Sequence, residues 1–211
     1  MDIAALDLFD KITEPASWFK TIFFKPIWVI QAMVMAMPWK LKTGIPTTYP
    51  RVVSFLRALR TNQPPFPTDD LKIAVAGFCW GGKHAFLLSH DNKETRVVRH
   101  QSQHWSARSM PLVDCVFVAH PSFIDLPGDV KRVAIPLSVA VGDKDMAMKE
   151  PAAKQMKEIL DARNDERYEA KILPGAKHGF AVRSHPEDKH EMAMALLAET
   201  QAIEWFNKCM T

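Results

Sequence analysis

Four short apolar runs, separated by segments of helical periodicity, set the pattern of the chain after residue 70. The runs are rich in β-branched residues and bounded by turn residues, which is typical of strands buried on both faces. They cover residues 71–76, 113–119, 133–141 and 168–173. Helical segments are expected at 83–89, 151–163 and 187–209. Strands that alternate with helices predict a parallel sheet flanked by helices, and therefore the α/β class.

The first 60 residues show no strand pattern and are expected to form a helical N-terminal part. Within it, 26–39 is an uncharged stretch of 14 residues between two lysines. No membrane span is predicted, because a span needs about 20 apolar residues. We expect a buried or groove-lining helix, with an interfacial membrane helix as the alternative. Its methionines make 22–39 a candidate lid segment over a substrate, and plain core filling is the equal alternative.

Length and composition narrow the class of protein. A chain of 211 residues, 47% of them apolar, predicts a single domain over 1–211 with a sizeable core. The net charge of +3 is not gathered into a basic stripe, so no nucleic-acid partner is expected. Three cysteines do not suggest a disulfide framework, and residues 1–10 lack the pattern of a secretory signal. Both observations favour a reducing, cytoplasmic location.

The polar stretch 91–110 interrupts the alternation of strands and helices. It contains three arginines and two histidines but no apolar periodicity. We expect a surface insertion, with an anion site as the alternative.

The turn after the first predicted strand carries the most specific motif of the chain. Residues 77–82 read Gly-Phe-Cys-Trp-Gly-Gly and connect a buried strand to a helix. A nucleophile elbow has this context, with glycines that let the strand and the helix approach closely. Cys79 is therefore the candidate nucleophile, and the backbone N–H of Trp80 is the candidate oxyanion donor. The alternative is a small buried cysteine in a turn.

A base and an acid follow in the order typical of such sites, each at the carboxyl end of a predicted strand. His178, in a glycine-flanked loop, is the preferred base, and His120 is its rival. Asp145 is the preferred acid, and Asp143 in the same loop is the alternative. Three groups in this order are a stronger signal than any one of them alone.

These motifs resemble the dienelactone hydrolase family, and fungal members are the most similar. The matching segments read GFCWGGK, VAHPSF, VGDKD and GAKHGFAVR. The resemblance implies an α/β-hydrolase fold, no cofactor and no metal. It also implies a Cys-Asp-His triad of Cys79, Asp145 and His178 that acts on a small lactone or ester.

The resemblance also suggests substrate-binding residues. Arg183 falls in the H-G-F-x-x-R position, where a guanidinium can meet a substrate carboxylate. Exposure to solvent without a substrate role is the equal alternative for Arg183. Phe123 and Phe180 are expected to line an apolar pocket.

The departures from the family pattern are as informative. Family members begin with further strands before the segment that resembles 6–9, so an N-terminally shortened sheet is expected here. A loop with the second oxyanion N–H and a glutamate that holds the resting thiol would be absent with those strands. Strand 71–76 would then form an unprotected apolar edge. Either the chain is truncated, or a partner covers the edge, for example a second copy in a homodimer.

Three functions remain open. The first is a cysteine hydrolase of a small lactone or ester in a fungal catabolic or secondary-metabolite pathway, which the complete triad favours. The second is a catalytically weak hydrolase-fold protein that binds a small molecule or partner, which the absent oxyanion loop favours. The third is a different reaction at an acyl group, such as an isomerisation or a cyclisation.

Overall fold

The computed structural model describes residues 8, 11–12, 16–103 and 107–211, and the chain divides into two compact units. The first unit is Met1–Arg51 and the second is Val52–Thr211. In the first unit a π-helical turn, η1 (Lys20–Phe24), continues directly into α2 (Lys25–Lys42). Helix α3 (Ile45–Thr61) crosses the division.

The apolar stretch of the first unit is helical as predicted, but its predicted burial is wrong. Ala32 is buried, whereas Ile30 and Val34 are 62% and 67% exposed. The methionines of this stretch do not form one face, because Met33 and Met37 are exposed while Met35 is half-buried. Consecutive side chains of a helix are about 100° apart, so alternate residues do not share a face.

The helical segment is also longer than the uncharged stretch on which the length argument rested. Because η1 extends α2 upstream past two lysines, the 19 residues Lys20–Pro38 are long and apolar enough to cross a membrane. This test considers only the length and the apolar composition of a helix, and the core helices of soluble proteins also pass it. A single helix of this kind is therefore only weak evidence of a span.

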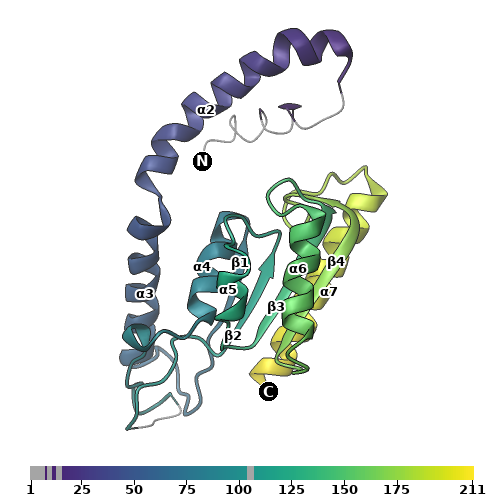
Figure 1. Ribbon diagram of the computed structural model, residues 1–211. Coiled ribbons are helices and arrows are strands. Elements are labelled where there is room, and N and C mark those ends of the chain that lie inside the picture. The colour runs from purple at the N-terminus through teal and green to yellow at the C-terminus, as the bar shows by residue number, and fades with distance from the viewer. Residues whose placement is uncertain (1–7, 9–10, 13–15, 104–106) are drawn as a thin grey trace. The chain divides into compact units, whose positions relative to one another are not determined.

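The second unit contains a four-stranded parallel sheet, which confirms the predicted α/β class (Figure 1). The strands are β1 (Ala74–Phe78), β2 (Cys115–Ala119), β3 (Leu137–Lys144) and β4 (Tyr168–Lys177), in that spatial order. All three pairings are parallel. The carboxyl ends of all four strands therefore meet at one edge of the sheet, where the predicted catalytic residues lie.

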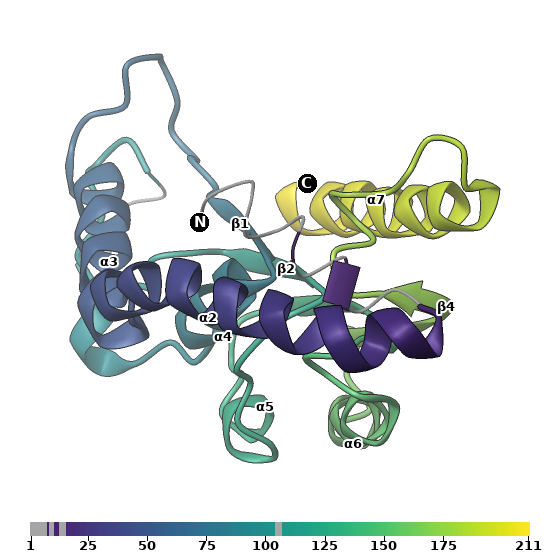
Figure 2. The same cartoon turned by 90° about the horizontal axis from the view of Figure 1, so that it is seen from above.

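Helices cover both faces of the sheet. Helix α7 (Lys189–Met210) covers one face, whereas α5 (Gly128–Lys131) and α6 (Glu150–Asp161) lie on the other (Figure 2). Helix α4 (Trp80–Ser89) packs on β1 and β2 beside α5, and η2 (Lys93–Thr95) is a short 3₁₀ turn. The core between the sheet and α7 contains Phe117, Ala119, Ala140, Leu173, Ala176, Phe180, Met194, Ala198 and Trp205.

Strand β1 is an edge strand, as the sequence predicts. It pairs with β2 alone in the described part of the chain. Every residue of β2 is buried, whereas Ala76 of the apolar strand β1 is exposed. Natural edge strands are usually protected by charge, proline or a bulge, and residues 74–78 offer none of these.

Buried polar side chains attach the stretch 91–110 to the rest of the second unit, which was not expected for a surface insertion. Arg99 is 5% exposed and donates to Asp114 Oδ1 at 2.7 Å. Gln103 is fully buried, and its amide donates to the carbonyl of Leu59 at 2.7 Å. Side-chain hydrogen bonds fix this segment instead of an apolar face, and periodicity does not reveal such bonds.

A buried ion cluster attaches α3 to the start of the sheet. Arg60 is fully buried, donates to the carbonyls of Leu112 and Leu71 at 2.8 and 2.7 Å, and pairs with Asp114. Asp114 also accepts from the backbone N–H of Ile73 at 2.7 Å. Burial would raise the pKa of Asp114, but this N–H and the guanidinium groups lower it overall. The cluster therefore fixes the backbone that leads into β1.

Arg60→Met should lower the free energy of unfolding by about 3 kcal/mol, because it leaves two carbonyls without this donor and removes one of the two guanidinium partners of the partly buried Asp114. Urea denaturation measures the loss. The matched control is Arg57→Met on the same helix, an exposed arginine whose side chain donates to the carbonyl of Glu94. This change should cost less than about 0.5 kcal/mol. Equal stability of the two variants would contradict the role of the cluster.

Candidate active site

Cys79 lies in a sharp turn between β1 and α4. Its backbone has φ 51° and ψ −120°, a strained conformation for a residue with a side chain. The neighbouring glycines allow the turn to be tight. A Cβ on Gly77 would lie 2.6 Å from Ala85 Cβ, and one on Gly82 would lie 2.9 Å from Pro121 Cβ. The strand and the helix could not approach this closely with larger residues.

The structure brings Cys79, His178 and Asp145 together in one hydrogen-bonded chain. His178 Nε2 lies 3.0 Å from Cys79 Sγ. On the other side of the ring, His178 Nδ1 lies 2.9 and 3.0 Å from the two carboxylate oxygens of Asp145. The thiol, the imidazole and the carboxylate therefore have the geometry of a nucleophile, a base and an orienting acid.

The two candidate acids have different partners. Asp145 is 2% exposed and also accepts from the backbone N–H groups of Ala147 and Met148 at 2.7 and 3.2 Å. These bonds hold the carboxylate toward His178. Asp143 accepts from the backbone N–H of Gly175 at 2.7 Å and so connects β3 to β4. The geometry favours Asp145 as the orienting acid and gives Asp143 a structural contact.

The electrostatics of the site favour a thiolate beside a charged imidazole. Burial alone would raise the pKa of Cys79, but hydrogen bonding and charge attraction from His178 lower it overall. Burial alone would lower the pKa of His178, but the bonds to Asp145 and Cys79 outweigh burial and raise it to about 9. A proton is thereby favoured on His178 over Cys79 near neutral pH.

Two further groups lie beside the thiol. Ser122 Oγ is 3.6 Å from Cys79 Sγ, and the backbone N–H of Trp80 interacts with the same thiol. Both contacts lower the pKa of Cys79. Sequence reasoning did not single out Ser122, although it belongs to the VAHPSF segment. Its role depends on how the loop after β2 folds back to the nucleophile turn, where Ser122 N–H donates to the Cys79 carbonyl at 3.0 Å.

His120, the rival base, does not hydrogen-bond the thiol. It is fully buried, and its ring lies edge-on to that of His178 with 5.1 Å between the ring centroids. Neither of its ring nitrogens hydrogen-bonds another of the described residues. Burial, together with the charge of His178, lowers the pKa of His120 to about 4. His120 is therefore a neutral packing neighbour of the base.

The side chain of Arg183 lies beside Gly179, the residue that follows His178. Gly179, directly after His178, has φ +92°, and a Cβ there would lie 3.1 Å from Arg183 Nε. Arg183 N–H donates to the Gly179 carbonyl at 2.9 Å. The glycine thus leaves room for an exposed guanidinium beside His178.

The two phenylalanines proposed for substrate binding differ. Phe180 is 4% exposed and belongs to the core under α7, with its ring centroid 5.5 Å from that of His120. Its contact with substrate stays a prediction, and core side chains enclose most of the ring in this structure. Phe123 is 65% exposed with φ 62° and remains available to a ligand.

Two kinds of group are not found among the described residues: a glutamate before Cys79 and a cluster of metal-binding side chains. No glutamate precedes Cys79 among them, so no partner of that type for the resting thiol is seen there. Within the same part of the chain, no group of three or more histidines, cysteines or acidic residues could hold a metal ion.

The sequence and the fold of this chain are similar to those of known hydrolases. A family model described as the dienelactone hydrolase family matches residues 45–210. "Hydrolase tropI" of Talaromyces stipitatus is 32% identical over 142 residues, which are 66% of this chain and 46% of that protein. The chain therefore spans just under half the length of this curated relative.

Solved structures are similar at lower identity. A putative dienelactone hydrolase from Klebsiella pneumoniae has 19% identity and a TM-score of 0.44, over 64% of this chain and 51% of that one. The carboxylesterase Cest-2923 from Lactobacillus plantarum has 15% identity and a TM-score of 0.43, over 65% and 58%.

Cys79 should react with iodoacetamide at pH 7 about tenfold faster than Cys115 or Cys209, because only Cys79 has a lowered pKa. Burial raises the pKa of the other two thiols. Peptide mass spectrometry after brief labelling gives the three rates.

The control for this labelling is His178→Gln. It should slow Cys79 at pH 6, and the difference should shrink as the pH rises above 9, where the thiol ionises without help. Equal labelling of all three cysteines in the unaltered protein would contradict the activated thiol.

Proposed function

Because the chain belongs to the dienelactone hydrolase family, with a match over residues 45–210, we propose that it hydrolyses a small lactone or ester through a cysteine nucleophile. The observation that carries this proposal is the continuous chain from Cys79 through His178 to Asp145. The α/β-hydrolase fold of the family places such groups at the carboxyl ends of parallel strands, as they lie here.

The proposed reaction has two acyl-transfer steps. The Cys79 thiolate attacks the substrate carbonyl, and the tetrahedral intermediate collapses to a thioester as the alkoxide leaves with the proton of His178. His178 then removes a proton from water, which attacks the thioester. The acid is released, and the thiolate–imidazolium pair is restored. Asp145 holds the ring in the orientation that both steps require.

Stabilisation of the intermediate is the least complete part of the site. The N–H of Trp80 interacts with the thiol and can donate to an oxyanion formed next to it. Acyl-transfer sites generally use two such donors, and one lost donor typically costs about 10²–10³ in kcat. This supports, as a second candidate function, a weak or inactive hydrolase that binds a small molecule or partner. A stoichiometric burst of acylation without turnover distinguishes this second function from the first.

The exposed guanidinium beside the base supports a substrate that carries a carboxylate. Arg183 lies over the backbone of Gly179, next to the residue that moves the proton. A guanidinium binds a carboxylate with two parallel hydrogen bonds and would orient the ester carbonyl toward Cys79. Phe123 offers an apolar contact for the rest of the substrate.

Three wider predictions belong to the same proposal. A role in a fungal catabolic or secondary-metabolite pathway and a cytoplasmic location both stay predictions. So does a homodimer through the edge of β1, whose exposed Ala76 and one-sided pairing support it. Sedimentation velocity of the 211-residue chain tests the homodimer.

Cys79→Ala should abolish turnover, because it removes the atom that attacks the carbonyl. Asp145→Asn should lower kcat/KM by about 10³–10⁴-fold, because the imidazole is no longer held in the required tautomer. Hydrolysis of an activated phenyl ester measures both effects.

Asp143→Asn is the matched control, because an amide oxygen can still accept from the N–H of Gly175. It should retain most of the activity. The reverse result, with Asp143→Asn inactive and Asp145→Asn unaffected, would assign the acid to the other aspartate.

Arg183→Met should raise KM about tenfold or more for esters that carry a carboxylate, because one charge-assisted interaction is lost. Neutral esters of the same size should show no change. The control is Arg167→Met, an exposed arginine before β4 that pairs with Asp165. An equal effect of Arg183→Met on charged and neutral esters would contradict the proposed carboxylate contact.

A further inference from the structure

Helix α2 carries an exposed apolar stripe that the proposed reaction does not use. The stripe consists of Ile27, Ile30, Val34, Met37 and Leu41, spaced alternately three and four residues apart. Their side chains are between 51% and 75% exposed. This spacing places all five on one side of the helix. An apolar surface of this kind on a single helix indicates an interaction.

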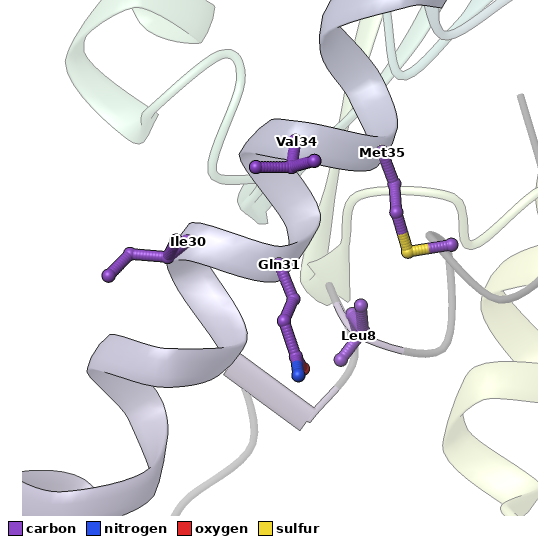
Figure 3. Close-up of a pocket in the computed structure, with 5 residues that line it drawn as sticks. All are labelled: Leu8, Ile30, Gln31, Val34 and Met35. Atoms are coloured by element: carbon purple, nitrogen blue, oxygen red, sulfur yellow. The ribbon is translucent and has the colours of Figure 1, made fainter.

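The opposite side of α2 has a different environment. Ala32 is 3% exposed. Gln31 and Met35 extend toward Leu8, whereas the Ile30 side chain points the other way (Figure 3). Ile30 and Val34 of the stripe also border the open hollow at this place. Ala32 is therefore enclosed, whereas the five side chains of the stripe are each more than half exposed.

The charge around the stripe has one sign. Residues 16–42 include four lysines and no acidic residue, and no aspartate or glutamate occurs anywhere between Glu14 and Asp69. The lysines are Lys20, Lys25, Lys40 and Lys42. They lie toward the two ends of the segment, while the stripe itself is free of charge. Trp18 and Phe19, at the start of the segment, are 74% and 50% exposed.

We propose that α2 docks this protein onto an anionic lipid surface, with the apolar stripe inserted among the lipid chains and the lysines at the headgroups. An interfacial helix combines an apolar face, basic residues and aromatic side chains in this way. Anionic headgroups attract each lysine near the surface, and this attraction adds to the burial of the stripe. The helix lies in the plane of the membrane and does not cross it.

The charge of the segment favours an anionic membrane over a second copy of the chain as the partner of the stripe. The spacing of the stripe would also fit a helix pair, but two copies would bring eight lysines together without an acidic residue between them. Paired helices generally place opposite charges beside their apolar seam. An anionic membrane supplies the opposite charge that the chain lacks in this segment.

Co-sedimentation of the full chain with vesicles tests the proposal. Vesicles of equal parts phosphatidylcholine and phosphatidylserine should bind the protein, and vesicles of phosphatidylcholine alone should bind at least about tenfold less. Added salt should weaken binding to the anionic vesicles, because it screens the lysines.

Two variants separate the apolar and the charged contributions. Ile30→Gln with Val34→Gln keeps good helix formers on exposed positions and should reduce vesicle binding by about tenfold or more. Lys20→Gln with Lys42→Gln should reduce binding to anionic vesicles and leave the weak binding to neutral ones unchanged. The matched control is Leu196→Gln with Leu197→Gln on α7, which are 61% and 49% exposed. This control should bind as the unaltered protein does.

Several outcomes would overturn the proposal. They are no binding to anionic vesicles, equal binding to neutral ones, or undiminished binding of the Ile30→Gln/Val34→Gln variant. Light scattering without vesicles provides the remaining test. A dimer that this variant abolishes would assign the stripe to a second copy instead. Labelling of Cys79 in each variant checks that the second unit remains folded, and it reports separately on the hydrolase proposal.

Discussion

The backbone conformation of one residue, the proposed nucleophile Cys79, determines where the proposed chemistry can occur. Cys79 is held at φ 51° between β1 and α4, and its side chain cannot relieve that strain without moving the strand or the helix. Close packing keeps both in place, since Gly77 and Gly82 have no room for a Cβ. The Arg60–Asp114 cluster then holds the backbone before β1 through the N–H of Ile73. A buried ion cluster far from the thiol in sequence thus supports the turn that presents it.

Two histidines pack against each other near this turn, and their surroundings shift their pKa values in opposite directions. His178 has a carboxylate on one side and a thiol on the other, and both favour its protonated form. His120 packs against the same ring but is surrounded by apolar groups and by the charge of its neighbour. A second positive charge so close to the first would be costly in a buried site. The neutral state of His120 is therefore a condition for the charged state of His178.

The sequence predicts the order of strands and helices and the chain positions of the triad, because buried runs and glycine turns are local signals. Cys79, His178 and Asp145 each follow a predicted strand, and the topology brings those strand ends together. The burial of Phe180 could not be predicted, because its position in the motif does not say which side of the loop faces α7.

Non-local polar contacts could not be predicted either. The hydrogen bonds that hold Gln103 and Arg99 join segments far apart in the chain. The exposure of α2 was likewise not evident, since an apolar helix at the surface and one in a core share the same composition.

The two proposed activities belong to different compact units of the chain. All three members of the triad, with Arg183 and Phe123, belong to Val52–Thr211, whereas the apolar stripe belongs to Met1–Arg51. The groups that set the pKa of Cys79 and His178 also lie in the second unit. The proposed acyl-transfer chemistry therefore depends on contacts within that unit. Binding of α2 to a surface would determine where this chemistry takes place without altering the residues that perform it.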